Sequence, residues 1–223
     1  MIFDDLASQL KREYEVFLFA LTGRYLSLSA AGVQVSPQSI TAVQKAGITL
    51  QGMFLEHANA LVRQFAQDYP SASAQARVTA FERELTRMSD INIKSLTDRM
   101  RGAAINPTAV GEVHGAMGLL LQQKMAEPEY RIPTKSGRSF DAKALLWTEA
   151  RDFGYRIWLD NKLEWIAQGG DLAQVQYPDP NHADNGMVFS ISGKTQGVPS
   201  YAEIKDKVFH YNAQAMIVPH VSL

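Results

Sequence analysis

Three side chains near the C-terminus are of types that bind metal ions: His182, Asp184 and His210. Imidazole nitrogens and carboxylate oxygens together can hold zinc or a similar ion. The three residues lack the close spacing that places two ligands on one face of a helix, and the sequence contains no cysteine. The absence of cysteine excludes disulfides and thiolate ligands. We therefore expect surface or hydrogen-bonding roles for these side chains, with no metal and no cofactor.

The segment Ser192-Gly193-Lys194-Thr195 matches the end of a phosphate-binding loop. The full pattern needs another glycine five positions before Gly193, where this sequence has Val188. The residues that follow do not predict a helix, so no helix N-terminus would face a phosphate. We expect a polar loop after a strand.

Catalytic chemistry has no signature in the sequence. The pattern G-x-S-x-G is absent, and there is no cysteine nucleophile. Glu149, Arg151 and Asp152 lie close together, and Asp160 and Glu164 are four residues apart. Charged residues spaced in this way are typical of a salt-linked helix surface, and two carboxylates without a cleft do not make an acid–base pair. We expect a protein that is not an enzyme.

The composition is that of a folded protein. The chain has 223 residues, of which 46% are apolar and 20% are charged, and its formal net charge is -1. These values support a buried core and exclude a disordered or low-complexity protein. No bulk positive field attracts nucleic acid, although the arginines of the third predicted helix leave a DNA-binding patch as an alternative. The apolar run 16–21 is too short to span a bilayer, and the acidic N-terminus is unlike a signal peptide. We expect no membrane association.

Apolar residues spaced three and four apart predict helices throughout the first 130 residues. The first is predicted to begin at Asp4 or Asp5 and to end at Gly23 or within 27–29. Ser36-Pro37 predicts the start of the second, with serine as N-cap and proline in the first turn. The later helices are predicted over 36–68, 73–101 and 106–126.

The stretch 127–140 is rich in proline, glycine and polar residues, and it predicts a linker. Asp141 is placed to cap a fifth helix that ends near Ala167, before Gly169-Gly170. The apolar period then changes from 3.6 to 2. Strands are predicted at 172–177, 187–191 and 216–218, with one helical turn at 200–204. The predicted fold is α+β: a mostly helical region, residues 1–130, followed by a small α+β domain, residues 140–223, with one long helix and a short sheet.

The order of segments in this C-terminal domain resembles a known family. The segments are Leu146–Arg151, Gln174–Tyr177, Asp179–Asp184, Gly186–Gly193, Phe209–Asn212 and Met216–Pro219. Over about residues 140–220 they resemble the minor head proteins of tailed bacteriophages, the Mu F-like head morphogenesis family. His182-Ala183-Asp184 stand where the family has paired cysteines, and Ala213 and Ala215 stand where cysteine or histidine is usual. We therefore expect core packing, without a metal, to maintain the fold.

The resemblance implies a structural component of the phage head. Such a protein is assembled in the host cytoplasm, is present in multiple copies in the virion, and assists head assembly or DNA packaging and delivery. Its expected partners are the portal or the major capsid protein, with packaged DNA as a further expected contact. Related phage proteins are sometimes joined to ADP-ribosyltransferase-like domains. That alternative would require Glu149 or Glu164 in a deep polar pocket.

The first predicted helix carries apolar residues on more than one side. The residues are Phe17, Phe19, Leu21 and Leu26. Phe17 and Phe19 are two positions apart, so they cannot both lie at the centre of one helix face. A helix that is apolar on more than one side needs more than one neighbour. We expect these residues to supply the main assembly contacts while the C-terminal domain folds mostly on itself. The alternative is a bundle that buries both sides alone.

Overall fold

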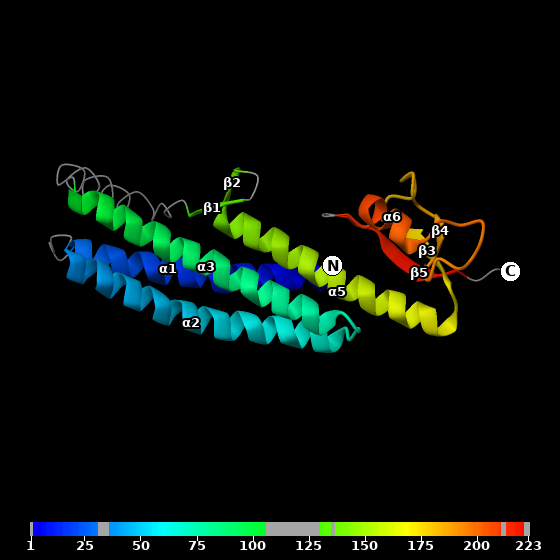
Figure 1. Cartoon of the computed structure of the whole chain (residues 1–223), viewed down its shortest axis with the longest axis horizontal. Coiled ribbons are helices and arrows are strands. Elements are labelled where there is room, and N and C mark those ends of the chain that lie inside the picture. Colours follow the sequence, from blue (N-terminus) through cyan, green and yellow to red (C-terminus); the bar gives the residue numbers. More distant parts are fainter. Residues whose placement is uncertain (1, 31–35, 106–129, 135–136, 211–212, 221–223) are drawn as a thin grey trace.

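The computed structural model describes residues 2–30, 36–105, 130–134, 137–210 and 213–220. The molecule is elongated, with long helices side by side at one end and a small sheet with a short helix at the other (Figure 1). The fold is α+β with a mostly helical N-terminal region, as the sequence predicts. Within the described ranges, no helix combines the length and the apolar character needed to cross a bilayer.

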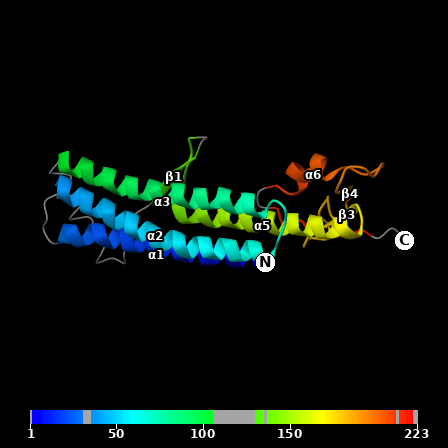
Figure 2. The same cartoon turned by 60° about the horizontal axis from the view of Figure 1, so that its bottom comes forward.

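Three long helices form the N-terminal bundle: α1 (Ile2–Ala30), α2 (Pro37–Asp68) and α3 (Ala74–Ile105). Figure 2 shows them running alongside one another. The predicted start of α2 is confirmed, because the Ser36 hydroxyl accepts a hydrogen bond from the Ser39 N–H and the Ser39 hydroxyl accepts one from the Ser36 N–H. α1 continues through the exposed Gly23, since one glycine inside a helix costs only about 1 kcal/mol relative to alanine. The helix predicted over 106–126 lies outside the described residues.

Helix α5 (Ala142–Gly169) links the bundle to the sheet. Asp141 caps it as predicted, because one carboxylate oxygen accepts hydrogen bonds from the N–H groups of Lys143 and Ala144. The first half of α5 lies against α1 and α3, and its second half extends beyond the bundle (Figure 1). Before α5, the strands β1 (Arg131–Pro133) and β2 (Ser139–Asp141) form an antiparallel hairpin where the sequence predicts only a linker.

The C-terminal sheet has the strand order β4-β3-β5, and both strand pairs are antiparallel. Its strands are β3 (Leu172–Gln176), β4 (Val188–Ser190) and β5 (Met216–Pro219), close to the predicted positions. The alternation along β3 places Ala173 and Val175 in the core. Helix α6 (Tyr201–Val208) begins with a capping box of Ser200 and Glu203, and it is longer than the single turn predicted there.

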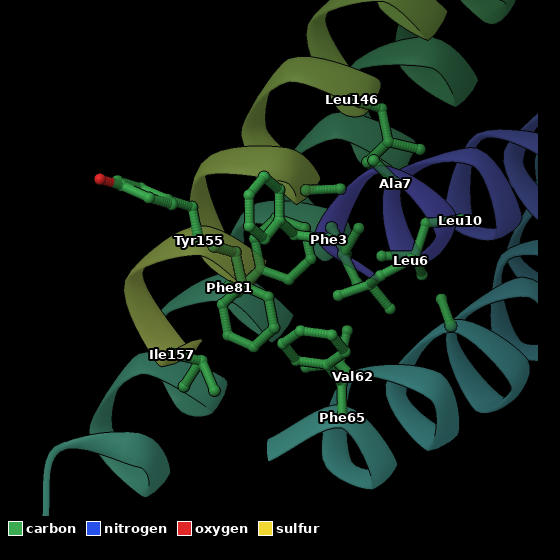
Figure 3. Close-up of a cluster of buried hydrophobic side chains, with 14 of the residues drawn as sticks. Phe3, Leu6, Ala7, Leu10, Val62, Phe65, Phe81, Leu146, Tyr155 and Ile157 are labelled. Atoms are coloured by element: carbon green, nitrogen blue, oxygen red, sulfur yellow. The ribbon is translucent and has the colours of Figure 1, made fainter. Parts of the chain in front are cut away.

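α5 uses different faces for the bundle and for the sheet. Phe81 of α3 stacks on Phe153 of α5, with ring centroids 4.7 Å apart. Figure 3 shows Phe3 and Leu6 of α1 in the same cluster of buried side chains as Phe81, whereas the Tyr155 hydroxyl points away from this cluster. The Tyr155 hydroxyl donates a hydrogen bond to the carbonyl of Ala215, just before β5, at 2.8 Å. Helix α5 therefore fixes the position of the sheet relative to the bundle.

One hydrophobic core crosses the predicted boundary between residues 1–130 and 140–223. A Cβ placed on Gly154 of α5 would lie 2.8 Å from the Cβ of Phe3, so this glycine permits the close approach of α1. Nearby, the buried Arg151 donates a hydrogen bond to the Asp4 carboxylate at 2.8 Å. The expectation that the C-terminal domain folds mostly on itself does not hold for α5, because the first half of this helix is packed against α1.

Candidate functional site

A shallow groove runs between α3 and α5. Its volume is about 380 Å³. Apolar side chains line part of it: Ala80, Phe81 and Phe153. The remaining lining residues are charged: Arg77, Glu84, Glu149, Asp152 and Arg156. Since two long helices supply every one of these side chains, the groove has rigid walls.

Most of the charges at this groove are paired. Glu84 pairs with Arg87, whose Nε and Nη2 each donate a hydrogen bond to one oxygen of the Glu84 carboxylate. The other pairs join Nε of Arg156 to Asp152 at 3.5 Å and Nε of Arg77 to Asp160 at 2.6 Å. One oxygen of Asp152, Oδ1, is buried and accepts no hydrogen bond within the described structure.

Glu149 is the exception among the charged groove residues. Within the described part of the chain its carboxylate has no hydrogen bond and no ion pair, and Arg151, two positions further along the sequence, pairs with Asp4 instead. The predicted salt-linked surface is therefore wrong for Glu149. Burial raises the pKa of its carboxyl, the carboxylates of Glu84 and Asp152 raise it further, and Arg87 lowers it. An ionised Glu149 thus weakens the folded state, and perturbed groups of this kind concentrate at functional sites.

The geometry of the groove does not suit acid–base catalysis. Such catalysis needs a second group opposite the first around a site that excludes water. Glu164 lies fifteen residues beyond Glu149, about 22 Å further along the helix axis. Its carboxylate accepts a hydrogen bond from the Ala72 N–H at 2.7 Å, which fixes the turn between α2 and α3 against α5. Glu149 lies in an open groove and Glu164 is exposed, so neither occupies the deep polar pocket that an ADP-ribosyltransferase-like site would need.

The structure does not bring His182, Asp184 and His210 together as ligands. The His182 ring stacks on Tyr177 with centroids 3.6 Å apart, and its Nδ1 accepts a hydrogen bond from the Asp184 N–H. The Asp184 carboxylate lies 3.6 Å from Nζ of Lys207 on α6. His210 is exposed after α6. Among the residues that the structure describes, no group of three His, Asp or Glu side chains could hold a metal ion.

The segment 192–195 is a loop, and Asp171 organises it. The Asp171 carboxylate accepts hydrogen bonds from the Ser190 hydroxyl, the Thr195 hydroxyl and the Ser192 N–H, at 2.5 to 2.7 Å. These donors hold the pKa of Asp171 well below its usual range. An ionised carboxylate at the centre of the loop would repel a phosphate. Asp171 was missed in the sequence analysis. The only signal for its role in the sequence was its position between Gly170 and the start of β3.

The predicted contact residues of α1 divide into two groups. Phe17 and Leu21 are buried, and the Phe17 ring stacks on Phe54 of α2 with centroids 5.5 Å apart. The bundle therefore buries these two side chains, and the prediction that they contact a partner is wrong. Phe19 is 60% exposed and stays a candidate contact residue. The side chain of Leu26 lies outside the described structure.

Comparisons of the chain with protein-family models, with curated proteins and with solved structures found no match.

Proposed function

We propose that this chain is a structural, non-catalytic minor head protein of a tailed bacteriophage. In this proposal it contacts the portal or the major capsid protein inside the head and assists head assembly or DNA packaging and delivery. The observation that carries the proposal is the order α5, β3, β4, α6, β5 in one packed unit. This is the order of elements on which the resemblance of residues 140–220 to Mu F-like head proteins depends.

Some of the residues that carry the resemblance are core residues of this unit. Phe189 of β4 and Phe209 after α6 are fully buried, with ring centroids 5.7 Å apart. Ala213 and Ala215, at positions where the family usually has cysteine or histidine, are also buried. Small apolar side chains fill these two positions, which supports a unit held together by its core.

The rigid connection between the bundle and the sheet supports a structural role. The contacts of α1 with α5 through Gly154 and Arg151 fix the orientation of α5, and Tyr155 fixes the sheet against the same helix. A rod of this kind can hold two surfaces at a set distance from one another.

Ion pairs reduce the cationic charge that α3 can offer to DNA. A DNA-binding patch needs cationic side chains that are free to reach phosphates. On α3, the arginines at 77, 87 and 101 each pair with a carboxylate of this chain. Pairing lowers the positive potential that α3 presents to a phosphate backbone.

A depletion experiment tests the proposed function. Phage are produced in host cells with and without expression of this chain, and the particles are separated by density. Without the chain we expect fewer DNA-filled heads, with the yield restored by the full chain supplied in trans. Unchanged yield and infectivity of particles made without the chain would contradict the proposal. Salt-dependent binding of duplex DNA by the purified chain would favour the DNA-binding alternative.

A further inference from the structure

The connection between β3 and β4 contains the pair Asn185-Gly186, the one place in the sequence where glycine follows asparagine. The side-chain carboxamide of an asparagine can be attacked by the main-chain nitrogen of the next residue, which releases ammonia. Glycine at that next position favours the attack, because it has no Cβ to crowd the nitrogen and leaves the backbone free to turn. This pair is therefore the position at which the sequence most favours spontaneous deamidation.

The fold holds both reacting groups in other hydrogen bonds. The Gly186 N–H donates to the carbonyl oxygen of Val175 on β3 at 2.8 Å. The half-buried Asn185 side chain is held at both ends, because its Oδ1 accepts a hydrogen bond from the Tyr177 N–H at 2.9 Å and its Nδ2 donates one to the Pro180 carbonyl at 3.1 Å. Gly186 has a φ of 84°, so the turn itself requires glycine after this asparagine.

We propose that Asn185 is a deamidation site that the folded turn blocks, so that its modification marks chains that have unfolded. In the reaction the main-chain nitrogen of Gly186 loses its proton to solvent and bonds to Cγ of Asn185. The Cγ–Nδ2 bond breaks, and Nδ2 leaves as ammonia. Water then opens the cyclic imide, at Cγ to give aspartate or at the main-chain carbonyl carbon to give isoaspartate. The inference is independent of the function proposed above.

The geometry of the cyclic imide explains the block. In the imide, Cγ of Asn185 takes the place of the hydrogen on the Gly186 nitrogen, and in the folded chain that hydrogen faces the Val175 carbonyl. Ring closure must therefore break this bond, and moving Cγ also draws Oδ1 and Nδ2 away from their two partners. The reaction then proceeds only from a locally opened turn. Three hydrogen bonds of ordinary net strength lower the population of that opened turn by about tenfold or more.

The modified chain cannot restore the same turn. A carboxylate carries no hydrogen to donate, so aspartate at this position leaves the Pro180 carbonyl facing a second acceptor. Isoaspartate adds one carbon to the main chain between two bonded groups, the Asn185 N–H on the His182 carbonyl and the Gly186 N–H on Val175. The mark is therefore lasting, because a chain that has been modified refolds with a less stable β3–β4 connection.

The test follows deamidation of each asparagine by peptide mass spectrometry. The purified full chain is incubated in mildly alkaline buffer, either folded or unfolded in guanidinium chloride, and circular dichroism establishes each state. Asn181 is the internal control, because it is exposed in the same connection and is followed by histidine. Dividing each rate for Asn185 by that for Asn181 removes the effect of denaturant on the chemistry. We expect Asn185 to react faster than Asn181 in denaturant, and its relative rate to be lower by about tenfold or more in the folded chain. Equal relative rates in the two states would overturn the proposal, as would an Asn185 that reacts no faster than Asn181 when unfolded.

The variants Asn185→Asp and Asn181→Asp test whether the mark is lasting. Both add the same charge to the same connection, but the Asn181 side chain makes no hydrogen bond within the described structure. We expect Asn185→Asp to shift the urea midpoint downward by clearly more than Asn181→Asp does. Equal shifts would show that the bond from Nδ2 to the Pro180 carbonyl does not hold the turn, and the proposed lasting effect would be wrong.

Discussion

Substitution of Gly154 by alanine tests whether α1 and α5 approach each other as closely as the structure indicates. The added Cβ would lie 2.8 Å from the Cβ of Phe3 and 3.4 Å from its Cα. Both of these atoms are fixed by the backbone of α1, so no side-chain rotation can relieve the first contact. α1 itself must move away from α5, which loosens the contacts of Leu6 and Phe3 around it.

The expected magnitude is a difference between two opposing effects. Overpacking a core typically costs about 1–3 kcal/mol. Replacing a helical glycine by alanine returns about 1 kcal/mol through helix propensity. Gly154→Ala should therefore lower the free energy of unfolding by about 0–2 kcal/mol.

Gly52→Ala is the matched control. Gly52 lies within α2, and a Cβ placed on it would meet no atom within 4 Å. Only the propensity effect then applies, so Gly52→Ala should raise the free energy of unfolding by about 0.5–1 kcal/mol. Urea unfolding followed by circular dichroism measures both values. If Gly154→Ala stabilises the chain as much as Gly52→Ala does, α1 is not packed against α5 as described.

Three further predictions concern a buried hydrogen bond, the charge of Glu149 and the zinc content of the chain. Tyr14→Phe should destabilise the chain by about 1–3 kcal/mol in urea unfolding, because the fully buried Asn92, whose Oδ1 already lacks a partner, would lose its bond to the Tyr14 hydroxyl as well. Glu149→Gln should raise the urea midpoint at pH 7. Because the pKa of Glu149 is raised in the folded state, the wild type loses stability as the pH rises through that pKa. The stability gained by Glu149→Gln should therefore vanish below the ordinary pKa of 4.5. An equal gain at every pH would count against this reasoning. Elemental analysis of the purified chain should find no stoichiometric zinc; one zinc per chain that is lost on His182→Ala or His210→Ala would disprove this.

The sequence predicts the elements whose signals are local. Ser36 and Asp141 predict the starts of α2 and α5, because the hydrogen bonds of a helix N-cap involve only the next three residues. The β1–β2 hairpin was missed, because strands of three residues are too short to show alternation. Gly137, with a φ of 77°, turns the chain between these strands, and in the sequence it indicates only a break in helical structure.

The features that depend on distant residues could not be predicted. Phe17 is apolar in either outcome, and only the position of Phe54 on α2 makes it a core residue instead of a contact surface. Glu149 looks like one more charge on a helix, because the repulsion and burial that set its pKa come partly from Glu84 on α3. Arg151 is only two positions away in the sequence, yet its guanidinium pairs with Asp4.

The composition of purified phage heads tests the central claim most directly. DNA-filled particles from the strain that encodes this chain are banded by density, and the ratio of the chain to the portal and major capsid proteins is measured by quantitative mass spectrometry. The account predicts that the chain bands with DNA-filled heads at a constant ratio to the portal, and that it remains there after salt washes that remove adsorbed protein. A chain that stays in the soluble fraction, or whose amount varies independently of the portal, would contradict it.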